Sequence, residues 1–449
     1  MTKKQFRHDF LRGLGSALIA LKESDDPKRY REIVIYGCLH NTTYDQQCEP
    51  HRNWYLYEAI TLLDEVKSIE QLVIEKFIRM KRDTWLFDQL TALLYQFAVN
   101  GSSDARKALY QQYNVMLAEL SRKRKFTAMC PRRDMFDWIC VWLTSLHGKR
   151  AFEKIVENIS EVLLPKNVDF FFDEWFYVNS VNKFGEDYVT NYLEKRAETL
   201  PAVRVYYEKA KEQNKRWDRN TEQAIPTLEQ VLAEAAKGKY RGRGLAIHFV
   251  RRANLDEVEK LAKIAMDETD EQVKVELLYA FRRWGDFNFP ETFLLKLSQS
   301  KNDELRLIAI GIMGKAPTDK TREFALSLIR HGTDVENGIA LLSKNLRRKD
   351  EALLYEVVKS IPVDRNGNSN WHSVFRDARA GIEKMRGQPQ TDILEYLYRE
   401  TLCSFCREGD VRLMHKKKVL SKAILQECRF DANDDLAEFA KQVMMKSEK

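Results

Sequence analysis

The stretch NDELRLIAIGIMG, residues 302–314, decides the fold because its apolar residues return at a fixed distance along the chain. Steps of 32 residues from Ala309 and Ile310 meet an apolar side chain every time, at Leu245, Leu277, Leu341, Ala246, Leu278 and Leu342. A second set, about half a period further on, consists of Leu261, Phe293, Ala325, Val357, Ala262, Leu294, Leu326, Val358, Ala265, Leu297, Ile329 and Ile361. Two apolar stripes per period, separated by enough chain for one helix and a turn, predict a repeated pair of helices.

Helices also explain the remainder of the chain. Apolar residues recur at helical spacing from the start, where Phe6, Phe10, Leu14, Leu18 and Leu21 predict a single helix. The chain holds only 18 Gly and 10 Pro, too few turn-formers for a β-sandwich or a doubly wound sheet. A helix pair of this kind can bury its apolar faces only against the next pair. The sequence therefore predicts an all-α, right-handed α-solenoid of stacked helical hairpins with about twenty helices.

Residues of the 302–314 stretch also resemble a known repeat family. Those similar to the second-half signature of HEAT repeats, an armadillo-like α-solenoid family, are Asp303, Leu305, Arg306, Ala309 and Ile310. The same pattern one period earlier consists of Asp270, Val273, Lys274, Leu277 and Ala280. The motifs YDQQCE, 44–49, and CSFCRE, 403–408, resemble uncharacterised bacterial HEAT-repeat domain proteins. The resemblance is strongest over 238–361, and it implies a structural polar ladder of Asp and Arg side chains along the inner helices.

The composition and periodicity of the sequence change at two places. KAKEQNKRWDRN, residues 209–220, is the most polar stretch of the middle, and the 32-residue register begins after it. DRNGNSNWH, 364–372, interrupts that register and is predicted to be a long loop. We therefore expect an amino-terminal region of irregular helical hairpins over 1–220, regular HEAT-like repeats over 221–363, and carboxy-terminal capping helices over 364–449.

Charge and cysteine content restrict the class of protein. Lys and Arg number 74 against 67 Asp and Glu, so the formal net charge of +7 is mild for 449 residues and requires no polyanionic partner. No apolar run reaches the roughly 18 residues of a membrane span, and the amino-terminal stretch lacks a secretory cleavage site. Seven cysteines in such a chain favour reduced thiols over a disulfide framework. We expect a cytoplasmic protein that is not secreted and has no membrane contact.

Catalytic signatures are missing from the sequence. It contains no Walker A motif, no G-x-S-x-G, no H-E-x-x-H and no dinucleotide fingerprint. We therefore assign no catalytic residue, no metal ligand and no cofactor. A non-enzymatic role is favoured, and enzymatic activity is left open.

Two groups of cysteine and histidine residues raise the question of a zinc site. The first consists of Cys38, His40, Cys48 and His51. Its spacing differs from that of zinc fingers, and the alternative is a corner between helices, where Asn41 ends one helix and Thr43 or Asp45 bonds to loop amides. The second consists of Cys403, Cys406, His415 and Cys428. There, a reactive thiol at a helix start is one alternative to metal binding, and buried packing is favoured at both places.

The most basic element, KGKYRGRG at 237–244, precedes a repeat helix. Its glycines would let a phosphate approach the backbone, and the helix start that follows offers free amides. An ordinary solvated turn is the alternative. The side chains predicted to bind a partner or a phosphate, in this element and on the repeats, are Lys237, Lys239, Tyr240, Arg241, Arg243, Arg251, Arg252, Lys274, Arg282, Arg283 and Arg306.

A binding scaffold fits these observations best, with a protein partner on the concave face of the repeats. The alternative is a nucleic-acid-binding protein, since HEAT-like DNA glycosylases, which it resembles by fold analogy alone, bind duplex DNA on a basic concave surface. A metal-dependent enzyme is a third hypothesis and requires the cysteine groups to bind metal. A ligand cage of aromatic residues in DFFFDEWFYVNSVNKF, 169–184, is weighed against core packing, which is the usual role of aromatic residues at helical spacing.

Overall fold

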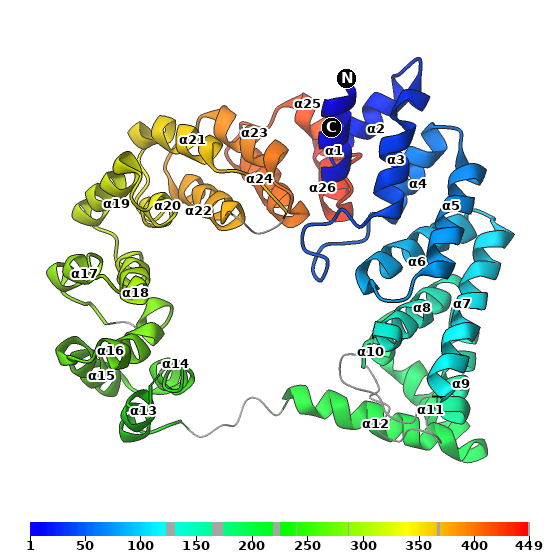
Figure 1. Ribbon diagram of the computed structural model, residues 1–449, viewed down its shortest axis with the longest axis horizontal. Helices are drawn as coiled ribbons and strands as arrows, with labels where there is room; N and C mark the ends of the chain where they lie inside the picture. Colours follow the sequence, from blue (N-terminus) through cyan, green and yellow to red (C-terminus); the bar gives the residue numbers. More distant parts are fainter. Residues whose placement is uncertain are drawn as a thin grey trace. The chain divides into compact units, whose positions relative to one another are not determined.

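The computed structural model of this chain describes residues 1–122, 131–163, 174–218, 225–238, 240–285, 287–365 and 369–447. Within these ranges the regular secondary structure is helical, with 26 α-helices and no strand (Figure 1). The all-α prediction is confirmed, while the expected number of about twenty helices is too low. None of the described helices combines the length and the apolar character that crossing a membrane would need.

One source of the extra helices lies at the amino terminus. The single helix predicted there is two helices, α1 (Lys3–Arg12) and α2 (Gly15–Lys22). Gly13 ends α1 in the left-handed conformation, with φ of 80°. Its N–H donates to the Phe10 carbonyl and the Leu14 N–H donates to the Asp9 carbonyl, each at 3.0 Å, which is the bonding pattern of a Schellman motif. The apolar stripe continues through this break, so periodicity alone does not reveal it.

The described helices fall into two compact units. The first unit consists of Met1–Thr221, Leu402–Glu408 and Ser421–Lys449, and the second unit consists of Glu222–Thr401 and Gly409–Leu420. Besides α1 and α2, the first unit contains α3 (Arg31–Leu39), α4 (Asn53–Leu62), α5 (Val66–Arg79), α6 (Thr84–Val99), α7 (Ser103–Arg122), α8 (Pro131–His147), α9 (Lys149–Asn158), α10 (Glu174–Phe184), α11 (Glu186–Thr199), α12 (Pro201–Asp218), α25 (Lys422–Cys428) and α26 (Asp434–Ser447). The boundary expected at residue 220 lies outside the described ranges.

The second unit contains the repeats. Its helices are α13 (Leu228–Ala235), α14 (Arg243–Arg252), α15 (Leu255–Asp267), α16 (Glu271–Leu278), α17 (Glu291–Leu297), α18 (Asp303–Met313), α19 (Asp319–His331), α20 (Val335–Leu342), α21 (Glu351–Ser360), α22 (Trp371–Lys384) and α23 (Thr391–Glu400). The residues of α24 (Ser404–Lys416) are divided between the two units after Glu408.

Helices of the second unit recur at the predicted period. The starts of α16, α18 and α20 are 32 residues apart, and each even-numbered helix from α14 to α22 contacts the next one in this row. The apolar positions that repeat along the sequence are buried, apart from the half-buried Leu245, Phe293, Val357 and Ile361. Each helix pair therefore covers apolar surface of its neighbours, as the period requires.

Polar side chains mark where the repeat helices begin. Asp270 accepts hydrogen bonds from the first amides of α16, and Asn302 does the same for α18. Asp303, the aspartate of the quoted stretch, is paired with Arg306 on its own helix. The acidic residue of the earlier HEAT-like pattern is thus a helix cap, a role that satisfies amides which no helical carbonyl can reach.

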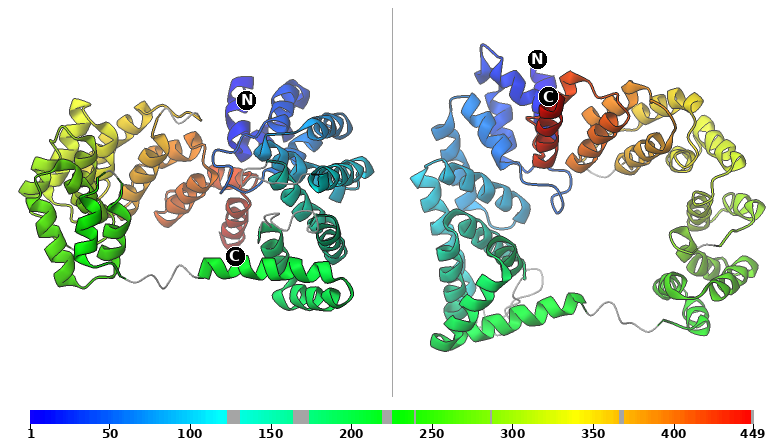
Figure 2. Two further views of the ribbon diagram at one scale, coloured as in Figure 1. Left: turned by 60° about the horizontal axis from the view of Figure 1, so that its bottom comes forward. Right: turned by 180° about the vertical axis from the view of Figure 1, so that it is seen from behind.

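The two ends of the chain meet within the first unit. The blue and red ends lie side by side in the right-hand view of Figure 2, and α25 contacts α2. The Ala432 N–H donates to the Gly13 carbonyl at 2.8 Å. At Gly15, a β-carbon would stand 2.0 Å from the Glu427 carbonyl oxygen. The contact of α25 with α2 therefore depends on a residue without a side chain at this position.

A buried ion pair joins residues 402–408 to the carboxy-terminal helices. Arg407 Nε lies 2.7 Å from Asp431 Oδ2 and Arg407 Nη2 lies 2.9 Å from Asp431 Oδ1, and both side chains have 0% exposure. Asp431 Oδ1 also accepts the Asn433 N–H at 2.9 Å, and Asn433 Nδ2 donates to the Ser404 carbonyl at 3.3 Å. Such a pair is stable only while both charges are present, because either one alone would be buried without compensation.

We predict that Asp431→Asn lowers the free energy of unfolding by about 3–5 kcal/mol, because the Arg407 guanidinium stays buried without its counter-charge. Urea denaturation followed by circular dichroism measures the change. The matched control is Asp104→Asn, which removes a solvent-exposed ion pair with Lys67 (2.6 Å) from the same unit and should cost much less, because water screens exposed charges. If the two variants lose the same free energy of unfolding, the buried Arg407–Asp431 pair is no more important for stability than an exposed one.

Gly15→Ala should destabilise the first unit by about 1–3 kcal/mol, because the new methyl group overlaps backbone of α25. The control is Gly244→Ala in α14, where no atom lies within 4 Å of the added β-carbon and the change should be neutral or stabilising. Thermal unfolding of both variants provides the comparison. An unchanged melting temperature for Gly15→Ala would show that α2 and α25 do not pack as described.

Candidate functional site

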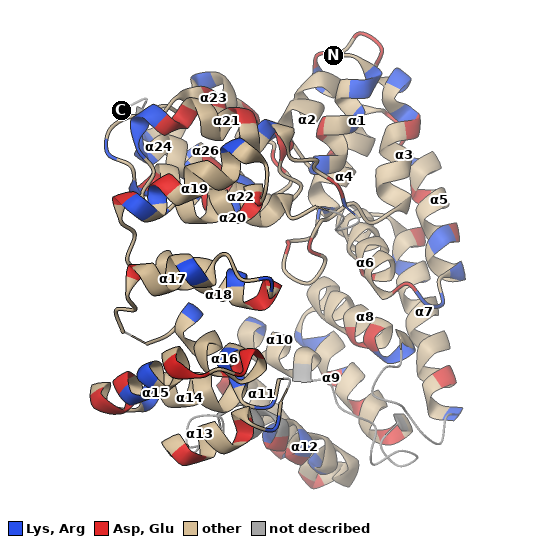
Figure 3. Cartoon of the chain, turned by 60° about the vertical axis from the view of Figure 1, so that its left-hand side comes forward, with Lys and Arg blue, Asp and Glu red and all other residues tan. Residues whose placement is uncertain are grey.

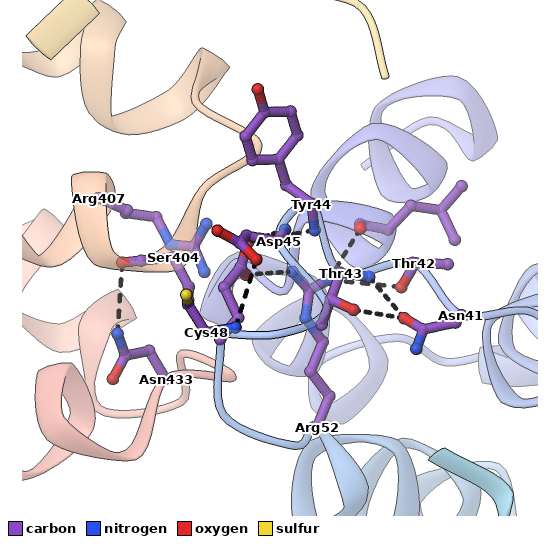
Figure 4. A network of polar contacts seen from close by, with 12 residues as sticks. Asn41, Thr42, Thr43, Tyr44, Asp45, Cys48, Arg52, Ser404, Arg407 and Asn433 are labelled. Atoms are coloured by element: carbon purple, nitrogen blue, oxygen red, sulfur yellow. Dashed lines mark hydrogen bonds and ion pairs between the residues drawn. The ribbon is translucent and has the colours of Figure 1, made fainter. Parts of the chain in front are cut away.

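The loop between α3 and α4 is held by side chains that bond to its own amides (Figure 4). Glu49 Oε1 accepts the N–H groups of Tyr44 at 3.1 Å and Asp45 at 2.9 Å. Asp45 Oδ1 in turn accepts the N–H groups of Gln47 at 3.1 Å and Cys48 at 3.3 Å. The predicted corner between helices, with Asp45 bonding to loop amides, is therefore confirmed.

Residues of α6 fix the beginning of this loop. Asn41 Oδ1 accepts the Thr43 N–H at 3.0 Å, and Asn41 Nδ2 donates to the Trp85 carbonyl at 3.1 Å. One turn along α6, the buried Gln89 amide donates to carbonyls at the end of α3. Its Nε2 lies 3.1–3.2 Å from the oxygens of Gly37, Cys38 and His40. These bonds satisfy carbonyl groups that the end of a helix leaves without helical partners.

Arg52 anchors the far end of the loop in the interior of the first unit. Its Nη1 donates to the Leu11 carbonyl at 2.9 Å, and its Nη2 lies 3.3 Å from Glu49 Oε2. Burial lowers the pKa of Arg52, and the negative charge of Glu49 opposes this shift. Arg52 and Glu49 thus compensate each other's charge in the interior. His51, the residue before Arg52, is therefore held in a defined position just before α4.

His51 belongs to a small hydrogen-bonded network with side chains of α6 and α8. His51 Nε2 lies 2.6 Å from Asp88 Oδ2, and Trp142 Nε1 donates to Asp88 Oδ1 at 3.1 Å. The His51 and Trp142 rings meet edge to face, with centroids 5.1 Å apart. Asp88 is the only charged residue in the sequence of α6, which is almost entirely uncoloured by charge in Figure 3. A lone carboxylate on an apolar helix is thus given two hydrogen-bond donors.

The protonation of His51 follows from these contacts. Burial disfavours its charged form, but the hydrogen bond and the negative charge of Asp88 outweigh that effect, so the pKa of His51 is raised above its ordinary value. The imidazolium form therefore persists to higher pH than in an isolated histidine, with Nε2 donating to Asp88.

Beside this group lies a cavity of about 360 Å³, which is within the range of ligand pockets, about 300–1,000 Å³. Trp85 of α6, Trp138 of α8 and Trp175 of α10 form its aromatic walls. The rings of Trp85 and Trp138 lie 5.2 Å apart, and Trp175 is 52% exposed. The cavity therefore presents indole surface to whatever enters it. Of the aromatic stretch 169–184, residues 169–173 lie outside the described part of the chain.

The charged groups of the cavity are mostly acidic. Its lining carboxylates are Glu49, Asp88, Asp134 and Asp137, and its lining cations are His51 and Arg52. Arg133 Nη2 lies 3.1 Å from Asp134 Oδ1 and offsets part of the excess. Tryptophan faces attract cations, and carboxylates reinforce that preference. Because Glu49, Asp88 and Asp134 each pair with a cation, it is chiefly the indole surface that suits the site to an apolar or cationic group.

The four possible zinc ligands near this site are not gathered around one point. His51 belongs to the cavity, whereas the His40 ring stacks on Tyr36 with centroids 4.1 Å apart. Burial raises the pKa of the Cys38 thiol far above its usual range, and a hydrogen bond to Asp45 raises the pKa of Cys48. Both thiols are therefore harder to ionise than an exposed, unpaired cysteine.

The three cysteines of the second group are buried in the interior of the protein. Cys403, Cys406 and Cys428 are buried residues of the first unit, and His415 belongs to the second unit. α24 begins at Ser404, so the Cys-x2-Cys motif spans a helix start as expected. Metal binding by these residues stays a hypothesis.

The basic residues predicted to bind a partner have different surroundings from one another. Lys237 and Arg306 are paired with acidic residues of neighbouring turns, and Lys239 lies outside the described residues. The Arg251 guanidinium lies 4.5 Å from the Trp284 ring centroid, and Arg282 packs against Gly311. Lys274 Nζ is 6.0 Å from the Phe293 ring centroid. The exposed residues of this set are Lys237, Tyr240, Arg241, Arg251, Arg252, Arg282 and Arg283.

Arg243 and Tyr240, by contrast, are brought together around one carboxylate. Arg243 Nε lies 3.0 Å from Glu276 Oε1, and Arg243 Nη2 lies 2.7 Å from Glu304 Oε2. The Tyr240 N–H donates to Glu276 Oε1 at 3.1 Å, and the Tyr240 ring lies 4.4 Å from the Arg243 guanidinium. Arg243 thereby links α14 to α16 and α18. Its charge serves to hold the repeats together and is already matched by carboxylates.

The sequence singled out His51 as a possible zinc ligand and Trp175 within an aromatic stretch, but it did not predict the cavity that brings them together. Its residues come from α6, α8 and α10 and from the loop before α4. A further signal was Asp88, the only charged residue within TWLFDQLTALLYQFAV. A buried charge in such a helix needs partners, which are usually functional or structural polar groups.

Neither models of protein families nor curated proteins give a match to this sequence. Membership of the HEAT-repeat family therefore stays a prediction based on the residues of the repeats. Function has to be inferred from the side chains of the described cavities.

Asp88→Asn should lower the pKa of His51, because the neutral amide no longer stabilises the imidazolium. Histidine proton NMR over a pH series measures the shift, with the other histidine resonances as internal controls. Because Asp88 raises the pKa of folded His51 above the unfolded value of 6.5, their interaction stabilises the protein fully below pH 6.5 and is lost as pH rises through the folded pKa. The stability difference between wild type and variant should therefore shrink towards alkaline pH, and an unchanged His51 titration would contradict the ion pair.

Proposed function

We propose that this chain is a HEAT-like α-solenoid protein that binds a protein partner, and that the cavity at His51 receives part of this partner. The observation that carries the proposal is the cavity itself, with tryptophan walls and polar groups that are already held in place. Binding surfaces gain most of their energy from a few large aromatic or arginine side chains in well-packed pockets. Trp85, Trp138 and Trp175 would supply such anchors.

The arrangement of His51 is suited to ligand binding. Its two described ring contacts are with Asp88, an acceptor, and Trp142, a donor to the same carboxylate. Neither of these side chains is a nucleophile that an imidazole could activate. The polar network keeps His51 and Asp88 in one geometry, and this pre-organisation reduces the entropy lost when a ligand binds.

Charge favours a protein over a nucleic acid at this site. The lining carboxylates outnumber the lining cations, and nucleic-acid affinity depends on cations that neutralise phosphates. The alternative, a nucleic-acid-binding protein of the kind found among HEAT-like DNA glycosylases, relies on the second unit. There Tyr240 is 58% exposed and Arg241 is exposed, which keeps this alternative testable.

Site-specific photocrosslinking tests the proposal in the native host. A benzoylphenylalanine replaces Trp175, whose exposed ring lies at the cavity, and cells are irradiated before purification of the full chain. We expect a discrete adduct that protease removes and nuclease does not. Introducing Trp138→Ala into the same chain should reduce its yield, because one aromatic wall of the cavity is lost.

The matched control carries the photoreactive residue at Tyr240, which has similar exposure but lies in the second unit. No protein adduct at position 175, or the same adducts from both positions, would overturn the proposal. A nuclease-sensitive adduct from position 240 together with none from position 175 would establish the nucleic-acid alternative.

A further inference from the structure

A second cavity of the first unit has the opposite charge. It has a volume of about 520 Å³ and lies where α8 passes into α9 and both face α7. Gly148 forms the turn between the two helices, with φ of 66° and no atom within 4 Å of where its β-carbon would be. The turn therefore leaves the side chains on either side of it open to solvent.

Three basic side chains line this cavity. His147 is the last residue of α8, and Arg150 and Lys154 follow on the first turns of α9. Residues four apart on a helix share one face, so Arg150, Lys154 and Asn158 form a single row along α9. All three basic side chains are exposed and can reorient towards a ligand.

Among the described residues that line this cavity there is no carboxylate. The neighbouring Glu157 lies 2.8 Å from Arg196 and 3.5 Å from Lys154, so its charge is shared with a cation outside the cavity. The pKa of His147 is lowered by burial and by the positive charges of Arg106 and Arg150. Helices α7 and α9 thus both contribute positive charge to the space around His147.

The interior of the cavity is apolar and aromatic. Leu143, Ala151 and Ile155 are buried residues that form its apolar surface, and Tyr113 is held there by a bond from Asn158 Nδ2 at 3.0 Å. The Tyr110 ring is 40% exposed and lies 5.5 Å from the His147 ring, tilted by 38°. Cations at the rim and an open aromatic face inside suit a ligand that has a phosphate at one end and a flat ring at the other.

We propose that this cavity is a binding site for a nucleoside monophosphate, with the phosphate between Arg150, Lys154 and His147 and the base against Tyr110. A dianionic phosphate would neutralise the positive charge of Arg150 and the part of the Lys154 charge that Glu157 leaves unmatched, and its oxygens accept several hydrogen bonds at once. A base has a flat face that can stack on a phenol ring. The site is independent of the partner-binding cavity at His51, which is lined mostly by acidic groups.

Calorimetric titration of the full chain with adenosine monophosphate, inorganic phosphate and adenosine tests both ends of the ligand. We expect the nucleotide to bind more tightly than either part alone. The double variant Arg150→Gln/Lys154→Gln should lose at least about tenfold in affinity, because two charge-assisted contacts disappear. Both side chains are exposed, so this variant should fold.

The matched control is Lys149→Gln, which removes the neighbouring cation of α9. Lys149 Nζ lies 3.8 Å from the Tyr188 ring centroid, and Lys149 is not among the residues that line the cavity. This variant should keep the wild-type affinity. The His147 resonance should also titrate at higher pH when the nucleotide is bound, since an anion stabilises the imidazolium.

Three results would overturn the proposal. The first is no detectable binding of the nucleotide at millimolar concentration, and the second is equal affinity for nucleotide and inorganic phosphate, which would leave no role for Tyr110. The third is a wild-type affinity in the double variant. None of them bears on the photocrosslinking at Trp175.

Discussion

The structure depends on the burial of each helix's apolar face by its neighbours, because most of its helices are shorter than about 15 residues and would be marginally stable alone in water. In the second unit, the even-numbered helices from α14 to α22 form a row, and the repeating apolar residues of each helix pair are covered by the adjacent pairs. Covering apolar faces also brings helix ends and connecting loops close to buried surface. Their polar groups then need partners within the protein, which explains why Gln89 donates to three carbonyls at the end of α3.

Buried and half-buried arginines join segments that are distant in the sequence in both units. In the first unit, Arg52 reaches the Leu11 carbonyl and Arg407 meets Asp431. In the second unit, Arg322 meets Asp350, and Arg243 meets Glu276 and Glu304. A guanidinium can bind two carboxylate oxygens and a carbonyl in one plane, which a lysine cannot. A buried guanidinium needs its carboxylate partner close by, so few other packings of the helices are possible. These contacts therefore specify which helices pack together as well as stabilising the packing.

The sequence revealed what is local or periodic. The helical class and the 32-residue spacing are visible because stacking copies the same apolar positions from one pair to the next. The break at Gly13 was hidden because the apolar stripe runs through it. The cavity at His51 was hidden for another reason: His51 is 37 residues from Asp88, and Asp88 is 54 residues from Trp142. No spacing rule relates residues that are brought together only by the packing of non-consecutive helices. For the same reason, charge runs in the sequence suggested a basic binding surface at Arg243, which the fold has matched with Glu276 and Glu304.

The two cavities at the ends of α8 differ in their chemistry because of the helices that line them. Around His51, α6 contributes a single carboxylate among apolar residues, and α8 contributes tryptophans and two further carboxylates. At the other end of α8, His147 meets Arg150 and Lys154 of α9, and no lining carboxylate opposes them in the described part of the chain. Opposite charges at the two ends of one helix can persist because each set is stabilised locally, by hydrogen bonds at Asp88 and by solvent exposure at Arg150. A cationic or apolar group and a phosphate would therefore be directed to different ends of α8, so the two sites can be occupied independently.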